Sequence, residues 1–223
     1  MLVTHGLAYD VAHVLAGGML LVSFVMLYQR RMFAVLNSFA LHAIVLALAV
    51  AWQAFVQNAP HLYITAAIAL LFKGIIIPLA LHRIVVKLEI HREVETVIGV
   101  GSTMLGGIGL VALSILLVLP ITVSSAAFAR EDLALALSIL LLGFLMMITR
   151  RNAITQVVGF MAMENGLILA ATGVKGMPLV VEISVAFSIL IAFVVFGVFF
   201  FRIRERFDSL DVHYLGTFRG GQG

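Results

Sequence analysis

Two ionisable residues lie within long apolar runs of the sequence and are the first candidates for chemistry. Glu164 lies in GFMAMENGLILAATG (159–173), and Lys73 lies in LLFKGIII (70–77). A charged residue at the centre of a membrane helix costs roughly 2.5–3.5 kcal/mol, so such residues are rare and by default mark a proton pathway or a paired site. Burial disfavours the charged form of both groups, so each can exchange protons near neutral pH. We therefore expect Glu164 to be the titrating centre of a proton relay, with Lys73 as its counter-charge or next station.

A structural alternative stays open for both residues. Glu164 would then be the buried partner of a polar group on another subunit, and Lys73 a snorkelling or structurally paired lysine. Lys73 lies about ten residues from the nearer end of its apolar run, which makes snorkelling difficult. Weaker candidates for bridging or hydrating a relay are Asn37, Asn165, Ser184 and Ser188.

Four further candidates are less specific. His42 lies well inside an apolar run, as either a relay group or a hydrogen-bonded packing histidine. Glu182 follows Pro178 in the first turn of its run, where the helix dipole favours a carboxylate, so relay and capping roles are equally open. Asp10 and His13 are three residues apart on one helical face, which suits either an exposed ion pair or a proton entry point.

Other chemistries find little support in the sequence. Haem would need two facing histidines, and His13 with His42 is the only plausible pair; retinal would need a lysine on the last apolar run, which has none. The absence of cysteine removes disulfides, thiolate metal sites and iron–sulfur ligation. The sequence contains no nucleophile–base triad, metal-binding cluster or nucleotide-binding loop. We expect no cofactor, no metal and no redox chemistry on this chain itself.

The composition places these residues in a membrane. Of 223 residues, 63% are hydrophobic and 11% are charged, with a mean hydropathy of +1.17. A soluble domain of this length cannot bury so much apolar surface, because folding hides only about two thirds of what the chain exposes. The first apolar run is too long for a cleavable signal peptide. The net charge of +3 is small and its basic residues cluster in loops, so nucleic acid is not an expected partner.

The apolar runs predict an all-α integral membrane protein. Seven segments have roughly the 20 apolar residues that a spanning helix needs: 6–28, 34–57, 62–86, 97–124, 132–149, 153–173 and 178–201. Cytoplasmic loops are rich in Lys and Arg. One side holds Arg130 and Lys175, whereas the other holds Arg30, Arg31, Arg83, Lys87, Arg92, Arg150, Arg151, Arg202, Arg204, Arg206 and Arg219. We expect the N-terminus outside and the C-terminus in the cytoplasm.

An internal repeat divides the predicted spans. LYQRRMFAVLNSFALHAIVLALA (27–49) parallels MITRRNAITQVVGFMAMENGLILAA (147–171). The predicted organisation is a first three-helix repeat with an amphipathic linker (1–96), a connector helix (97–130), a second parallel repeat (131–204) and a cytoplasmic tail (205–223). Small residues at Gly17, Gly18 and in GVGSTMLGGIG (99–109) are typical of closely packed membrane helices.

These motifs resemble a known family. RRN (150–152), GFMAMENGLILA (159–170) and the tail RIRERFDSLD resemble the small K subunit of respiratory complex I, and THGLAYDV followed by LYQRR resembles the start of that subunit. The length and MENG are most similar to hydrogenase-4 component E, the K-like subunit of group 4 membrane-bound [NiFe]-hydrogenases and formate hydrogenlyases. The resemblance covers essentially the whole chain. In it, Glu164 matches the second-helix glutamate of the K subunit, whereas Glu182 lies nearer the start of its span than the third-helix glutamate does.

The resemblance implies a non-catalytic subunit of an oxidoreductase complex in the inner membrane. Its expected partners are antiporter-like and K-, J- or H-like membrane chains and a peripheral [NiFe]-hydrogenase arm, with proton translocation coupled to redox chemistry on those chains. Two alternatives stay open. The chain is either a membrane scaffold whose charges pair at interfaces, or a subunit of a multisubunit cation/proton antiporter, although K-like subunits there are about half this length.

Overall fold

The computed structural model of the chain describes residues 2–87, 94, 96–121 and 127–173, together with residues 190 and 197. By its contacts the chain divides into two compact units, Met1–Val185 and Ala186–Gly223. All the helices described below belong to the first unit. Glu182, the tail and, apart from residues 190 and 197, the expected span 178–201 lie outside the described residues.

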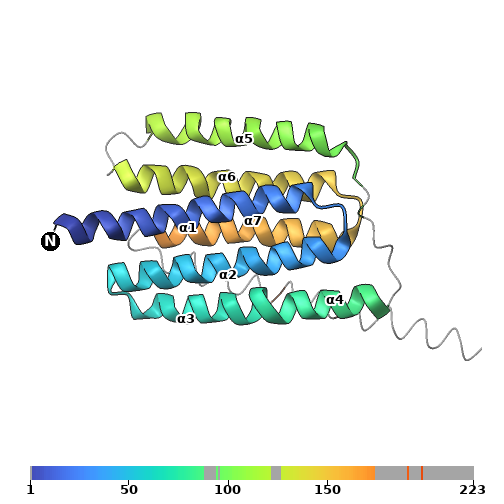
Figure 1. Cartoon of the computed structure of the whole chain (residues 1–223), viewed down its shortest axis with the longest axis horizontal. Helices are drawn as coiled ribbons and strands as arrows, with labels where there is room; N and C mark the ends of the chain where they lie inside the picture. The colour runs from blue at the N-terminus through green and yellow to red at the C-terminus, as the bar shows by residue number, and fades with distance from the viewer. Residues whose placement is uncertain are drawn as a thin grey trace, which may run out of the picture. The chain divides into compact units, whose positions relative to one another are not determined.

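The described residues form long helices joined by short turns (Figure 1). They are α1 (Leu2–Tyr28), α2 (Met32–Gln57), α3 (Pro60–Ile68), η1 (Ala69–Ile76), α4 (Ile77–Lys87), α5 (Val100–Ile121), α6 (Ala127–Thr149) and α7 (Ala153–Gly173). Since α3, η1 and α4 are continuous, the described part of the chain has 6 helices long and apolar enough to cross a membrane. The expected all-α, multi-pass membrane fold is confirmed, and these helices match the first six predicted spans.

The turn between α2 and α3 shows how the sequence ends one span and begins the next. Asn58 adopts a left-handed conformation with φ of 51°, a conformation that asparagine tolerates better than most residues. The N–H groups of Asn58 and Ala59 bond to carbonyls of the last turn of α2. Pro60 then begins α3, where its missing N–H would have had no helical partner.

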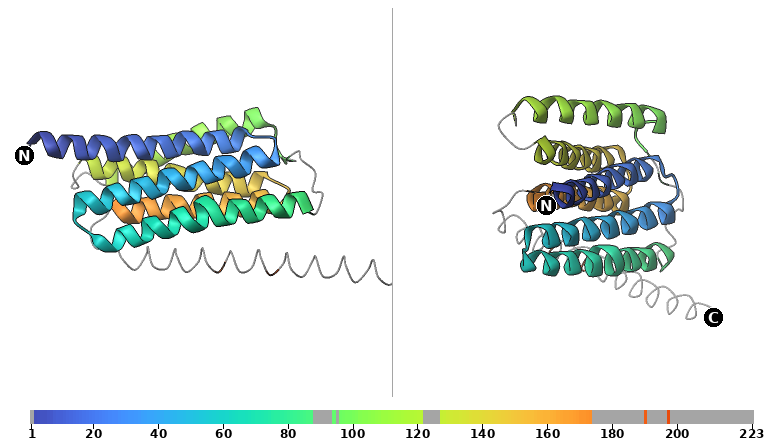
Figure 2. Two further views of the ribbon diagram at one scale, coloured as in Figure 1. Left: turned by 60° about the horizontal axis from the view of Figure 1, so that its bottom comes forward. Right: turned by 60° about the vertical axis from the view of Figure 1, so that its left-hand side comes forward.

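The order of the helices places four elements around a common centre. α5 packs on α6 at one edge of the described bundle, and α3–η1–α4 packs on α2 at the other edge (Figures 1 and 2). α2 also contacts α1 and α7, and α6 contacts both α1 and α7. The side chains that α1, α2, η1 and α7 direct toward one another therefore meet inside the bundle.

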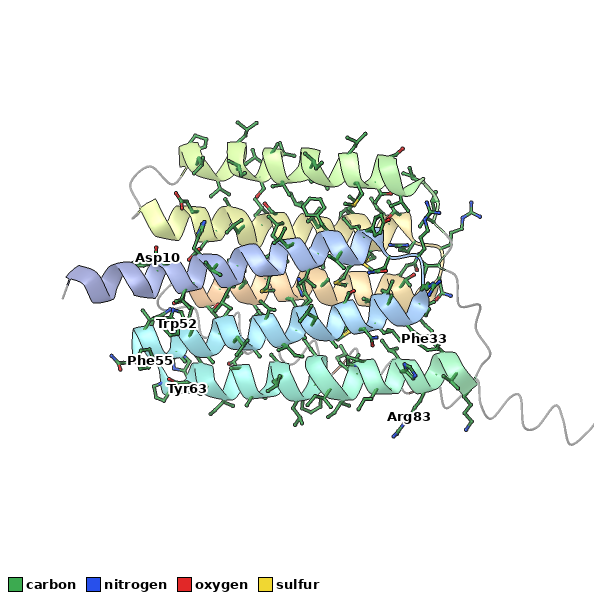
Figure 3. All side chains as sticks on the ribbon, in the orientation of Figure 1. Asp10, Phe33, Trp52, Phe55, Tyr63 and Arg83 are labelled. Atoms are coloured by element: carbon green, nitrogen blue, oxygen red, sulfur yellow. The ribbon has the colours of Figure 1, made fainter. Side chains whose placement is uncertain are left out.

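The two ends of the bundle differ in character. Arg30 and Arg31 follow α1, and Arg150 and Arg151 follow α6, so that both pairs lie with Arg83 at one end, called the basic end below. Figure 3 shows aromatic side chains at the opposite end, where Trp52, Phe55 and Tyr63 lie. Basic loops and interfacial aromatic residues are features of membrane-spanning bundles. Which end faces the cytoplasm stays a prediction.

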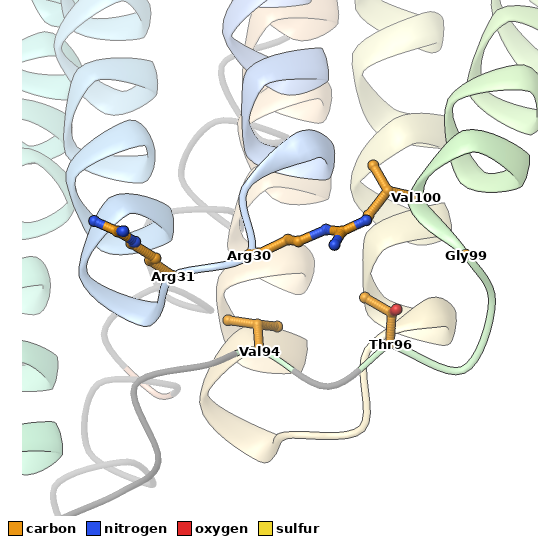
Figure 4. A pocket seen from close by; sticks show the side chains of 6 residues that line it. All are labelled: Arg30, Arg31, Val94, Thr96, Gly99 and Val100. Atoms are coloured by element: carbon orange, nitrogen blue, oxygen red, sulfur yellow. The ribbon is translucent and has the colours of Figure 1, made fainter.

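Backbone contacts join the turns at the basic end. The N–H of Val94 bonds to the carbonyl of Arg30 at 2.7 Å, and the N–H of Val97 bonds to that of Thr149 at 2.8 Å. An open cavity of about 470 Å³ lies beside this junction, lined by Arg30, Arg31, Val94, Thr96, Gly99 and Val100 (Figure 4). In the close-up, Arg30 extends toward Val100 at the start of α5, whereas Arg31 extends the other way.

Arg150 is buried in this junction, with 1% of its surface exposed. Its Nη2 donates to the carbonyls of Met26 and Leu27, at 3.1 and 2.7 Å. These are among the carbonyls that lack a helical partner at the end of α1, where a cation is also favoured by the helix dipole. Burial lowers the pKa of the guanidinium, but an arginine in a protein still keeps its charge. Arg150 thus fixes the α6–α7 turn to the end of α1.

The closest helix contact is between α6 and α7, and glycines make it possible. A Cβ at Gly159 would lie 2.8 Å from the backbone nitrogen of Met147, and one at Gly166 would lie 2.7 Å from that of Leu140. A Cβ at Gly143 would overlap the backbone of Met163. Within this chain, Gly17 of span one has open space around its Cβ position, whereas Gly107 in α5 meets Phe24 and Leu142 closely.

Gly159→Ala should destabilise the protein, because the added methyl meets backbone that cannot move without separating the two helices. We expect a loss of about 1–3 kcal/mol, the usual cost of overpacking, measured as a lower midpoint of thermal unfolding in detergent by circular dichroism. The matched control is Gly17→Ala, which adds the same methyl in open space. Equal effects of the two substitutions would contradict the role of the α6–α7 contact.

Candidate functional site

An ion pair lies at the centre of the bundle. Nζ of Lys73 on η1 is 3.1 Å from Oε2 of Glu164 on α7, and only 2% and 5% of the two side chains are exposed. Lys73 is near the middle of the span Pro60–Lys87, and Glu164 is near the middle of α7. The two charged residues that interrupt long apolar runs of the sequence are therefore neighbours, and both lie near the middle of their helices.

Hydrogen bonds extend this pair across three more side chains. Nζ of Lys73 donates to Oδ1 of Asn165 at 2.9 Å. The other end of that amide, Nδ2, lies 3.0 Å from Nδ1 of His42 on α2. Nε2 of His42 lies 3.1 Å from Oγ of Ser23 on α1, and that hydroxyl donates to the carbonyl of Met19 at 3.0 Å. We call the five side chains of Glu164, Lys73, Asn165, His42 and Ser23 the polar chain.

The polar chain is shielded from solvent along its whole length. Measured over the whole residue, every member is at most 4% exposed, and His42 and Asn165 are fully buried. Met19, Leu46 and Ile168, each four residues from a member of the polar chain on the same helix, belong to the buried apolar core. Without water in an apolar interior, polar groups must satisfy one another, and unmet ones are costly. The mutual hydrogen bonds explain how five polar side chains are tolerated there.

The Ser23 end of the polar chain lies nearer the basic end of the bundle than the Glu164 end does. Glu164 and Lys73 lie near the helix centres, but Ser23 lies in the last turns of α1, which ends at Tyr28. At about 1.5 Å of rise per residue, Ser23 is roughly 7.5 Å from that end. The carbonyls of Met26 and Leu27 that bind Arg150 lie about one turn further along. The polar chain thus extends from the middle of the bundle to within about one helical turn of the carbonyls that bind Arg150.

A π-helical segment presents Lys73 to this interior. In η1 the N–H of Ile77 bonds to the carbonyl of Phe72, five residues earlier, as in a π-helix. Pro78 follows, and in a regular α-helix its ring would clash with the carbonyl of Gly74. The wider π turn relieves that clash and leaves Lys73 and Gly74 buried. Short π segments inside α-helices are frequent at functional sites.

The predicted entry residues lie at the other end, away from the polar chain. His13 contacts α6, with Nδ1 3.2 Å from Asp132 and Nε2 3.9 Å from Glu131. His13 therefore contacts carboxylates of α6 in place of the ion pair with Asp10 that was one of the two alternatives for these residues. Ten residues, or about 15 Å of helix, separate His13 from Ser23. Among the described residues, no group of three or more His, Cys, Asp or Glu side chains has the arrangement of a metal site.

The structure adds members that the sequence indicated weakly or not at all. Asn165 was one of several bridging candidates, yet it holds the central position between Lys73 and His42. Ser23 was not a candidate, because a single serine in an apolar run gives no sign of its partner. Glu182 lies outside the described residues, so its relay role stays a prediction, as do the roles of all the candidate residues.

A multi-pass, all-α membrane protein with a charged pair inside its bundle is the class that this fold and site define. Along nearly its whole length the chain is similar to hydrogenase-4 component E. Those of Escherichia coli K12 and of Shigella flexneri are each 27% identical over 208 residues, 92% of this chain and 96% of theirs. An uncharacterized protein of Mycobacterium tuberculosis is 26% identical over 208 residues, 92% of this chain and 94% of that protein.

These matches confirm the resemblance to hydrogenase-4 component E. No protein-family model matches the chain. No solved structure matches it either.

Lys73→Met should destabilise the protein by about 3–5 kcal/mol, because it leaves the carboxylate of Glu164 buried without its ammonium neighbour. The double variant Lys73→Met/Glu164→Leu should recover most of that loss, since apolar replacements of a buried pair are often neutral. Thermal unfolding of the two single variants and the double variant in detergent measures the coupling. Additive losses in the double variant would contradict a direct interaction between the two side chains.

Proposed function

We propose that the chain is a membrane subunit of a hydrogenase complex and that its polar chain relays protons within the bilayer. The similarity to hydrogenase-4 component E supports the first part. The observation that carries the second is the buried, hydrogen-bonded sequence of side chains from Glu164 to Ser23. Redox chemistry would take place on other chains, namely a peripheral [NiFe]-hydrogenase arm held beside antiporter-like subunits in the inner membrane.

From Lys73 to Ser23, the hydrogen bonds of the polar chain have one direction. As an ammonium, Lys73 is only a donor, and Oδ1 of Asn165 is only an acceptor, so Nδ2 of Asn165 donates to Nδ1 of His42. His42 is then neutral, with its proton on Nε2 and directed at Ser23, whose hydroxyl donates to Met19. A continuous run of donors is the arrangement through which proton transfer at one end is felt at the other, because buried hydrogen bonds polarise one another.

Three members of the polar chain can gain or lose a proton. Glu164 and Lys73 exchange one directly across their 3.1 Å contact, and His42 is the third group. The carboxamide of Asn165 does not titrate, so it holds Lys73 and His42 in place, and transfer between them would require a water molecule to enter beside the amide. Buried water of this kind is common where several polar groups converge.

The same arrangement explains how a distant redox event would drive the relay. Charges interact much more strongly in a protein interior than in water. A charge that appears on a neighbouring subunit would therefore alter the balance between the ionised and neutral forms of the Lys73–Glu164 pair. The alternative hypothesis is a scaffold in which this pair only holds η1 to α7. An experiment on the assembled complex distinguishes the two hypotheses.

Glu164→Gln in the assembled complex should abolish proton translocation while hydrogenase activity persists, because an amide of the same size cannot take part in proton exchange. The measurement is the hydrogenase-driven acidification of proteoliposomes, followed beside the rate of hydrogen turnover. Ser138→Ala is the matched control, since Ser138 is a buried polar residue whose hydroxyl donates within its own helix, to the carbonyl of Ala134. Unchanged translocation in Glu164→Gln would exclude the relay and favour the scaffold.

A further inference from the structure

Asn165 stands between two groups that can each carry a proton. Its Oδ1 lies 2.9 Å from Nζ of Lys73, and its Nδ2 lies 3.0 Å from Nδ1 of His42. A carboxamide has one end that accepts and one end that donates. It therefore cannot present the same kind of group to both neighbours at once. This asymmetry links the protonation of Lys73 on η1 to that of His42 on α2.

The observed orientation suits one protonation state. An ammonium at Lys73 offers only donors, so it requires the oxygen of Asn165. The NH₂ group then faces Nδ1 of His42, which must offer a lone pair. A proton on Nδ1 would place two donors 3.0 Å apart in a fully buried site, where an unmet donor is costly. With Lys73 charged, His42 is neutral.

The opposite state requires the amide to turn over. A half-turn of the carboxamide presents Oδ1 to a protonated Nδ1 of His42 and Nδ2 to Lys73. Nζ must then accept, which only the neutral amine can do. We infer that Asn165 is a positioning residue that makes protonation of Lys73 and His42 mutually exclusive, with one orientation of its side chain for each state. In the exchange, one proton leaves Nζ and one arrives at Nδ1.

The other neighbours bias this exchange without enforcing it. Glu164 faces Lys73 from α7 and favours the ammonium, so the observed orientation is the resting one. Ser23 faces His42 from α1 and accepts from Nε2, which carries a proton in both states. Neither side chain has to reorient. The exclusion therefore resides in the amide, and it would ensure that the relay carries one proton at a time between these stations.

The use of this exclusion in proton transfer rests on the proposed function, but the exclusion itself is a property of the chain. The full-length protein, labelled with ¹⁵N in histidine and lysine and reconstituted in lipid bilayers, allows both groups to be followed by NMR across the neutral pH range. Signals of His42 and Lys73 are assigned by their loss in His42→Gln and Lys73→Met. Neither measurement needs the hydrogenase complex, so a failed translocation test leaves this one unaffected.

Two results are expected. In the wild type, wherever Lys73 is an ammonium, His42 should be the neutral form with its proton on Nε2. In Asn165→Asp, the carboxylate accepts from both sides, so an imidazolium signal should appear at His42 while Lys73 stays charged. The matched control is Asn152→Asp. There the side-chain oxygen that accepts from the N–H of Ile154 is retained at the start of α7, so the wild-type pattern should persist.

The wild-type measurement decides the question even where a variant folds poorly. An imidazolium, or a neutral ring protonated on Nδ1, in the presence of charged Lys73 would overturn the inference. So would a folded Asn165→Asp protein in which His42 keeps the wild-type neutral signal at every pH examined.

Discussion

Inside an apolar bundle, a polar side chain is tolerated only where other protein groups or trapped water satisfy it. That constraint accounts for most of what is unusual here. The charge of Lys73 needs Glu164, the amide of Asn165 needs both Lys73 and His42, and the ring of His42 needs Ser23. The hydrogen bond or ion pair to the next group offsets the cost of burying each one, so the polar chain is a single unit that links α1, α2, η1 and α7.

The same constraint shapes the backbone around this unit. Pro78 removes a donor and obstructs a carbonyl, and the π turn of η1 accommodates both effects while it directs Lys73 inward. At the basic end, Arg150 supplies donors to carbonyls of α1 that no helical N–H can reach. Irregular backbone and buried charge thus occur where they satisfy each other, in the region that the proposed relay would use.

Much of the fold follows from the sequence alone, because the length of an apolar run is set by the thickness of the bilayer. The predicted span 34–57 is α2 (Met32–Gln57), and the predicted span 153–173 is α7 (Ala153–Gly173). Which helix faces meet does not follow from run length. His42 and Asn165 are 123 residues apart in sequence, and no spacing rule relates them. For the same reason Ser23 was missed, and the partner of His13 was sought on its own helix rather than on α6.

The glycine contact between α6 and α7 has a mechanical consequence. Because backbone lies against backbone at Gly143, Gly159 and Gly166, the two helices have no side-chain layer that would let one slide past the other. The two helices therefore move as one unit. Glu164 and Asn165 belong to this unit, whereas Lys73 lies on a separate helix. A displacement of the α6–α7 pair relative to η1 would therefore change the distance between the Glu164 carboxylate and the Lys73 ammonium, and with it the strength of their attraction.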